Sequence, residues 1–170
     1  MKLCSTPQQV VAAIAQPARI IAVDGIQLSG KTRLARELGS ELGLKVIKAD
    51  DYLNKNQGSF FSQLNLTALA KDLGNSGPCI FEGICCLQVL GALGESADHL
   101  IYVKRMYASG WADEARLDAF EKHGPPLLDD SESPDPLAVH LRNLWIEVAS
   151  YHLRYQPHKT ASLTYARSAA

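Results

Sequence analysis

The stretch DGIQLSGKT, residues 24–32, contains the residue types that bind the phosphates of a nucleotide. Gly25, Gly30, Lys31 and Thr32 satisfy the pattern G-x-x-x-x-G-K-[ST] in full. In such a loop, backbone N–H groups surround phosphate oxygens, the lysine neutralises charge on the outer phosphates, and the hydroxyl coordinates Mg²⁺. The pattern therefore predicts a loop that binds ATP, or a related triphosphate, together with Mg²⁺.

The residues on both sides of this loop support the interpretation. The apolar run RIIAVDG predicts a buried strand before it, and KTRLARELGSELG predicts a helix after it, with leucines at every fourth residue. A helix that begins near Gly30 would direct the positive end of its dipole at the phosphates. The alternative, a glycine-rich turn with a surface lysine, explains neither Thr32 nor these flanking patterns. The predicted nucleotide-binding residues are Gly25, Ile26, Gln27, Leu28, Ser29, Gly30, Lys31, Thr32 and Arg33.

Two carboxylates end other predicted strands and are the expected partners of the loop. Asp50 ends the strand pattern in IKADDY, and Glu82 follows the apolar residues CIF. Phosphoryl transfer needs a carboxylate that orients the acceptor hydroxyl and takes its proton, and others that hold hydrated Mg²⁺. We predict Lys31, Asp50 and Glu82 as catalytic residues, and Thr32, Asp50 and Glu82 as metal-binding residues. Which carboxylate acts as the base stays open, as does an ordinary turn or strand-end role for each.

Strand and helix patterns alternate along the rest of the chain, which predicts an α/β fold. Further strands are expected in LKVIKADDY, PCIFEGICCL, DHLIYVKRM and ASLTYAR, and a loop and helix in FFSQLNLTALAKDLG. A long helix should begin at Asp135 and Pro136 and end before Pro157. Such alternation implies right-handed crossovers and a parallel sheet covered by helices on both faces.

The chain of 170 residues has the length of one domain, and we predict a single domain over residues 1–170. Thr6, Pro7 and Gln9 form a capping-box pattern, so a leading helix is expected within residues 1–17. Residues of about 105–135 are expected to form a lid and loop region. Its end, the acidic and proline-rich segment 123–136, is interpreted as a long loop with a solvated surface.

Composition excludes several classes of function. The formal net charge is -1 and no run of basic residues occurs, so neither nucleic acid nor an acidic membrane surface is an expected partner. The start of the chain has no apolar leader pattern, and no stretch is long and apolar enough to span a membrane. Cys4, Cys79, Cys85 and Cys86 lack metal-ligand spacing and are expected to be reduced thiols, which favours the cytoplasm.

These motifs together resemble the uridine kinase-like branch of the P-loop kinases, which includes uridine-cytidine kinases, nicotinamide riboside kinases, phosphoribulokinase and bacterial pantothenate kinase. The segment IIAVDGIQLSGKTRLARELGSEL is similar to the family's first strand, phosphate loop and helix. VIKADDYL resembles its strand ending in Asp-x-Phe/Tyr or Asp-Asp-Phe, and CIFEGICCL its strand containing Glu-Gly between apolar residues. ADHLIYVKRM and YHLRYQPHKTASLTYAR resemble its fourth strand and closing segment, so the resemblance spans most of residues 18–167.

The resemblance implies a doubly wound, five-stranded parallel sheet of the P-loop NTPase type, in the order 2-3-1-4-5, with helices on both faces and a mobile lid. It assigns phosphate binding to the loop that begins at Gly25 and ends at Thr32. Asp50 would take the acceptor-hydroxyl or Mg²⁺ role, and Glu82 the role at the substrate or at Mg²⁺-bound water. Arg105 and Arg116 are the candidates for the lid arginines.

The sequence also departs from the family. The segment after DDY lacks the Asp-x-Pro motif with which uridine kinases shape their substrate pocket, so the resemblance does not identify uridine as the acceptor. Tyr52, Phe60 and Phe61 could stack on a ring of the substrate or belong to the core. Arg105 and Arg116 could equally be solvated surface residues. Ser162 stands where relatives usually have Asp after Ala.

The leading hypothesis is a kinase that transfers the γ-phosphate of ATP to a hydroxyl of a nucleoside or similar small metabolite. A nucleotide-binding regulatory module without an acceptor is a second hypothesis, favoured by the few arginines and the missing substrate motif. A P-loop NTPase that hydrolyses its nucleotide is the third. The sequence names neither the acceptor nor the oligomeric state, and a homo-oligomer stays open.

Overall fold

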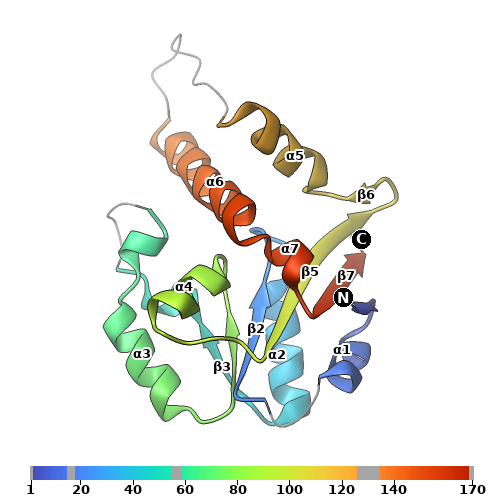
Figure 1. The fold of residues 1–170 in the computed structure, drawn as a ribbon, viewed down its shortest axis with the longest axis vertical. Helices are drawn as coiled ribbons and strands as arrows, with labels where there is room; N and C mark the ends of the chain where they lie inside the picture. The colour runs from blue at the N-terminus through green and yellow to red at the C-terminus, as the bar shows by residue number, and fades with distance from the viewer. Residues whose placement is uncertain (1, 15–17, 55–58, 126–134, 169–170) are drawn as a thin grey trace.

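The computed structural model describes residues 2–14, 18–54, 59–125 and 135–168. These residues form one mixed sheet with helices packed on both of its faces (Figure 1). Two separate clusters of buried apolar side chains fill the spaces between sheet and helices. The expectation of an α/β fold with a largely parallel sheet is therefore confirmed.

The sheet is built around a buried central strand, β2 (Ile20–Asp24). All five of its residues are buried, because each face of the sheet is covered by helices. β2 pairs in parallel with β4 (Cys79–Glu82) on one side and with β5 (His99–Tyr107) on the other. Beyond these, β3 (Lys45–Lys48) pairs in parallel with β4, and β7 (Leu163–Ser168) pairs in parallel with β5.

Two further strands make the total seven among the described residues, so the prediction of five was wrong. β1 (Lys2–Cys4) pairs in parallel with β7, and β6 (Gly110–Trp111) pairs antiparallel with β5. The order is β1-β7-β5-β2-β4-β3 with β6 off this path, which differs from 2-3-1-4-5 by these additions. The five expected strands keep their predicted order relative to one another. Strands of two and three residues are too short to show periodicity in a sequence.

Helices follow most of the strands and close the crossovers. On one face lie α1 (Pro7–Ala13), whose capping box joins Thr6 and Gln9, and α2 (Lys31–Leu42). The other face is covered by α3 (Leu66–Asn75), α4 (Cys86–Ala92), α5 (Glu114–His123) and α6 (Pro136–Tyr155). Short helical turns complete the chain: η1 (Ala49–Tyr52), η2 (Phe61–Gln63) and α7 (Pro157–Thr160).

Several predicted boundaries are corrected. The expected leading helix in residues 1–17 is only Pro7–Ala13, and a strand precedes it. The strand in LKVIKADDY ends at Lys48, so Asp50 lies in the turn η1. The strand in PCIFEGICCL ends at Glu82, and its last cysteine already begins α4. Within the expected lid region the structure has β6 and α5, and residues 126–134 of the expected acidic loop lie outside the described residues.

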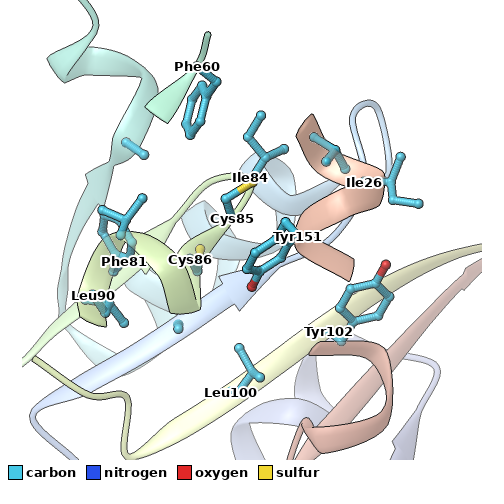
Figure 2. Packing of buried hydrophobic residues seen from close by; sticks show 14 of the residues in the cluster. Ile26, Phe60, Phe81, Ile84, Cys85, Cys86, Leu90, Leu100, Tyr102 and Tyr151 are labelled. Carbon is cyan, nitrogen blue, oxygen red and sulfur yellow. The ribbon is translucent and has the colours of Figure 1, made fainter. Parts of the chain in front are cut away.

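The alternation of side chains along β2 separates the two cores. Ile21 and Val23 belong to the cluster under α1 and α2, whereas Ile20 and Ala22 belong to the cluster under α3, α4 and α6. Figure 2 shows part of the second cluster, where Tyr151 of α6 lies beside two cysteines of the segment that begins α4. Because β2, β3 and β4 pair in parallel, their carboxyl ends lie at the same end of the sheet, where the candidate site is found.

In the part of the chain described here, no helix combines the length and the apolar character that crossing a lipid bilayer requires.

Candidate nucleotide and phosphoryl-transfer site

The predicted phosphate loop, residues 25–32, connects β2 to α2 and requires glycine at two positions. Gly25 has φ 152° and Gly30 has φ 103°. A Cβ on Gly25 would lie 2.8 Å from the carbonyl oxygen of Val103, and one on Gly30 would lie 2.9 Å from the side chain of Arg167. The Ser29 N–H donates to the Ile26 carbonyl over 3.2 Å, which closes the turn. The two motif glycines therefore serve both the backbone path and the close packing of the loop.

Lys31 begins α2, and its ammonium group is held inside the loop. Its side chain is buried, and Nζ donates to the Ile26 carbonyl over 2.8 Å. Burial lowers the pKa of Lys31, and the nearby Asp24 carboxylate is the strongest charge that opposes this. A positive charge is thus already placed where the loop would bind phosphate.

Glu82 and Thr32 meet although 50 residues separate them. Glu82 is the last residue of β4 and Thr32 lies in the first turn of α2, and the Thr32 hydroxyl donates to Glu82 Oε1 over 2.9 Å. Burial raises the pKa of Glu82, while the hydrogen bond from Thr32 and the charge of Lys31 lower it. Two of the side chains predicted to bind metal, Thr32 and Glu82, are therefore in direct contact.

Asp50 lies at the same end of the sheet, in the turn η1 that follows β3. Its side chain is exposed and lines the cavity described next. Lys48 at the end of β3 is in register with Glu82 at the end of β4, which brings the two carboxylate-bearing segments together. Lys31, Thr32, Asp50 and Glu82 therefore all line one cavity, and their roles stay predictions.

One cavity of about 580 Å³ connects the phosphate loop to the turn η1 and to helix α6. Its wall consists of a phosphate-loop part, three carboxylates and a mixed apolar and polar part. These residues are Gln27, Leu28, Gly30, Lys31, Thr32, Asp50, Leu53, Ser59, Phe60, Gln63, Glu82, Gly83, Ile84, His140, Asn143, Leu144 and Glu147. The volume is within the range of cavities that bind small molecules.

The α6 wall of this cavity was missed by sequence reasoning. Glu147 accepts the backbone N–H groups of Phe60 and Phe61 over 2.7 and 2.8 Å. It thereby holds the loop before η2 against α6, and Phe60 itself lines the cavity. These residues lie 86 or 87 positions apart in the sequence, so no local pattern could join them.

Arg167 of β7 is a second residue that sequence reasoning missed. Its guanidinium donates to the Ser29 carbonyl over 3.4 Å and packs against Gly30. A positive group thus lies directly on the outer side of the phosphate loop. The only available signal was the place of Arg167 at the end of the last predicted strand.

Seven predicted site residues do not line the cavity. Gly25, Ile26 and Ser29 belong to the loop itself, and the other four are Arg33, Tyr52, Arg105 and Arg116. The Tyr52 hydroxyl donates to Asp72 over 2.5 Å, and burial raises the pKa of Tyr52 to about 12. Arg33 is exposed and pairs with Glu37 within α2. The two lid arginines also have other partners: Arg105 pairs with Asp113 over 3.3 Å, and the Arg116 guanidinium lies 3.6 Å from the ring centre of Trp145. Local contacts therefore hold all four side chains away from the cavity.

The residues present fit a nucleotide with Mg²⁺. The Ser29 hydroxyl is buried and has no hydrogen-bond partner within the described part of the chain, so it can donate to a phosphate oxygen. Thr32, Glu82 and Asp50 offer the oxygen ligands that Mg²⁺ prefers. No group of three or more His, Cys, Asp or Glu side chains among the described residues is arranged to hold a metal ion alone. Magnesium here would therefore take further ligands from phosphates and water.

No protein-family model matches the sequence, and no curated protein matches it. Among solved structures, the chain is similar to the one described as "Structure of a Possible Uridine Kinase from Bacillus stearothermophilus". The similarity has a TM-score of 0.54 at 15% sequence identity, and covers 92% of this chain and 94% of that chain. A likeness at this identity shows the fold alone, so the two chains share an α/β fold with a largely parallel sheet covered by helices.

Proposed function

We propose that this protein is a small-molecule kinase that transfers the γ-phosphate of ATP to a hydroxyl of a nucleoside or similar metabolite. The observation that carries the proposal is one cavity lined by the predicted phosphate loop, by the carboxylates Asp50 and Glu82 beside it, and by an apolar and amide wall that includes Glu147. A nucleotide and a second small molecule both need room at such a site. The cytoplasmic location and the single domain over residues 1–170 are kept as parts of the proposal.

The loop residues would bind and orient the triphosphate. Backbone N–H groups of the loop and the Ser29 hydroxyl donate to phosphate oxygens, and Lys31 neutralises charge that develops during transfer. Thr32 and Glu82 would hold Mg²⁺, which would supply positive charge to stabilise the phosphates during transfer.

Asp50 is proposed as the residue that orients the acceptor hydroxyl and accepts its proton. It is the exposed carboxylate of the cavity, whereas Glu82 is buried and already accepts a hydrogen bond from Thr32. A general base must reach the hydroxyl of a bound substrate, and an exposed side chain in the cavity satisfies that condition. We therefore assign the base role to Asp50 and the metal role to Glu82.

The part of the cavity away from the loop supports an acceptor with a largely apolar body and polar edges. Leu53, Phe60, Ile84 and Leu144 supply the apolar surface. Gln63 and Asn143 supply amide groups that both donate and accept hydrogen bonds. A heterocyclic ring attached to a hydroxyl-bearing sugar has this combination of surfaces, which is why a nucleoside-like acceptor is favoured.

A nucleotide-binding regulatory module is the second candidate function. It is favoured by the partners of Arg105 and Arg116, which lie away from the cavity and would not contact a transferring phosphate in this conformation. A hydrolytic NTPase stays third, since water could replace the acceptor at Asp50.

The proposal is tested by ADP formation with ATP, Mg²⁺ and a panel of nucleosides, ribosides, sugars and pantothenate. Lys31→Ala serves as the blank. It removes the positive charge from the phosphate loop and leaves unchanged the residues proposed to contact the acceptor. ADP formation that depends on one acceptor and disappears in the blank supports a kinase and names its substrate class. Full ATP binding without acceptor-dependent ADP formation favours the regulatory module.

A further inference from the structure

Asp24 is a buried carboxylate directly before the phosphate loop, and the proposed function gives it no role. It is the last residue of β2 and its exposed fraction is 0%. Oδ1 accepts the Gly25 N–H over 2.6 Å, Oδ2 accepts the Tyr151 hydroxyl, and the backbone of Cys86 donates a further hydrogen bond. A buried carboxylate that accepts three hydrogen bonds is a specific structural feature. We call Asp24 and its three donors, Gly25, Cys86 and Tyr151, the junction.

Tyr151 completes this junction from helix α6. Its ring is buried, and its oxygen accepts the Leu87 N–H over 3.2 Å while its hydroxyl hydrogen is donated to Asp24. Figure 2 shows the ring beside Cys85 and Cys86 with the hydroxyl directed toward β2. Asp24 and Tyr151 thus bind the first two N–H groups of α4, whose preceding residue Cys85 has φ 59° and gives no side-chain cap.

The junction connects the three segments that carry the proposed chemistry. β2 continues into the loop that holds Lys31, the segment before α4 begins at Glu82, and α6 forms a wall of the cavity. A shift of α4 relative to β2 would therefore move Glu82 relative to Thr32. Asp24 is also the strongest charge acting to keep Lys31 protonated against burial.

We propose that Asp24 and Tyr151 are positioning residues for phosphoryl transfer, which hold Lys31 and Glu82 in register through the hydrogen bonds that join β2, α4 and α6. This inference rests on the proposed function. It also predicts a defined response to pH, since the junction depends on an ionised Asp24.

The groups that face Asp24 set this response. They are Lys31 of α2, the thiols of Cys85 and Cys86 at α4, the hydroxyl of Tyr151 on α6 and the phenol of Tyr102 on β5. Burial raises the pKa of Asp24 to about 6, and the hydrogen bond from Tyr151 is the largest effect that lowers it. Removing that hydroxyl should therefore raise the pKa of Asp24 further.

The test compares Tyr151→Phe with Tyr102→Phe by the dependence of kcat/KM on pH. Tyr102 is the matched control, because it is a buried tyrosine whose hydroxyl bonds His152 over 2.7 Å instead of Asp24. Tyr151→Phe should move the acid limb of the profile upward by about one pH unit and lower kcat about tenfold at pH 7. Tyr102→Phe should leave the acid limb in place.

Asp24→Asn is the second variant, and it keeps the shape of the side chain while removing its titration. Its profile should lose the acid limb that Tyr151→Phe moves. Positioning by this pair is overturned if both variants keep the wild-type acid limb, or if Tyr102→Phe moves it equally. If the wild type has no transferase activity, the proposed function fails, and the same pH comparison is made on ATP binding. An unchanged pH dependence of ATP binding in Tyr151→Phe and Asp24→Asn then overturns the positioning role.

Discussion

Leu28 is the residue of the phosphate loop whose backbone conformation is least suited to its side chain. Its φ is 63° although it is not glycine, and 83% of its surface is exposed. A non-glycine residue in this region carries strain, and an exposed leucine gains little from burial. The strained position lies between the two motif glycines, where the loop would wrap around phosphate.

Two substitutions of Leu28 should separate the effect of backbone strain on stability from the effect of losing the side chain. Leu28→Gly should unfold with a free energy about 1 kcal/mol higher than Leu28→Ala, because only glycine adopts this φ without a penalty. Urea denaturation of the two variants gives the comparison, and alanine is the control for loss of the side chain. Equal stabilities would show that the loop backbone is not strained at this residue.

Asp50 and its neighbour Asp51 offer a matched pair for the proposed base. Both side chains are exposed on η1, but of the two Asp50 lines the cavity. Asp50→Asn should lower kcat by roughly 10²–10⁴-fold with little change in ATP affinity, because the amide cannot take a proton. Asp51→Asn should keep kcat near the wild-type value. Steady-state kinetics and ATP titration check both, and a high kcat in Asp50→Asn would exclude it as the base.

Helix α6 contributes to the acceptor wall through the carboxylate of Glu147. Without it, the N–H groups of Phe60 and Phe61 lose their acceptor and the loop before η2 loses its anchor. Glu147→Ala should therefore raise KM for the acceptor about tenfold while KM for ATP changes less.

Two further variants complete this experiment. Glu147→Gln keeps one carbonyl oxygen and should have an intermediate acceptor KM, whereas Glu41→Ala, at an exposed position of α2, should have no effect. An equal rise of both KM values in Glu147→Ala would contradict an effect confined to the acceptor part.

Sequence reasoning predicted well the elements that have a regular hydrophobic pattern over many residues or a complete motif. The loop, α2, the central strands and α6 belong to this group, because periodicity over many residues and cap residues such as Asp135 are local signals. β1 and β6 were missed, since two or three residues have no period. α4 was missed because its first residues were assigned to the preceding apolar strand. The junction of Asp24 with Tyr151 joins positions 127 residues apart, and only the fold brings them together.

The same distinction applies to the site. The sequence predicted that Lys31, Thr32, Asp50 and Glu82 would meet, because the motif and the ends of parallel strands locate them. It did not predict the partners of Arg105 and Arg116, because a side-chain contact depends on neighbours from other elements. Substrate choice also depends on such neighbours.

Stability of the whole molecule should fall in acid because of a buried histidine cluster. His152 has an exposed fraction of 2%, and burial lowers its pKa from 6.5 to about 4. Between these values the unfolded chain takes up a proton that the folded chain does not, so the free energy of unfolding falls as pH decreases. For His152 alone this loss is roughly 3 kcal/mol between pH 7 and pH 4.

The measurement is urea unfolding at several pH values in wild type, His152→Gln and His123→Gln. His152→Gln should have a shallower dependence on pH, reduced but not abolished, since the pKa of His158 is also lowered to about 4. His123 is exposed, so its variant should follow the wild type. Asp24 acts in the opposite direction through its raised pKa, and it is common to all three proteins. Parallel curves for wild type and His152→Gln would contradict this explanation.

The most direct test of the central claim is the fate of the γ-phosphate, followed by ³¹P nuclear magnetic resonance with ATP, Mg²⁺ and the best acceptor of the panel. We predict a new phosphomonoester signal that grows with ADP in the wild type and is missing in Lys31→Ala. Release of free phosphate alone would identify a hydrolase. ATP that stays intact while bound, across the whole panel, would contradict a kinase and favour the regulatory module.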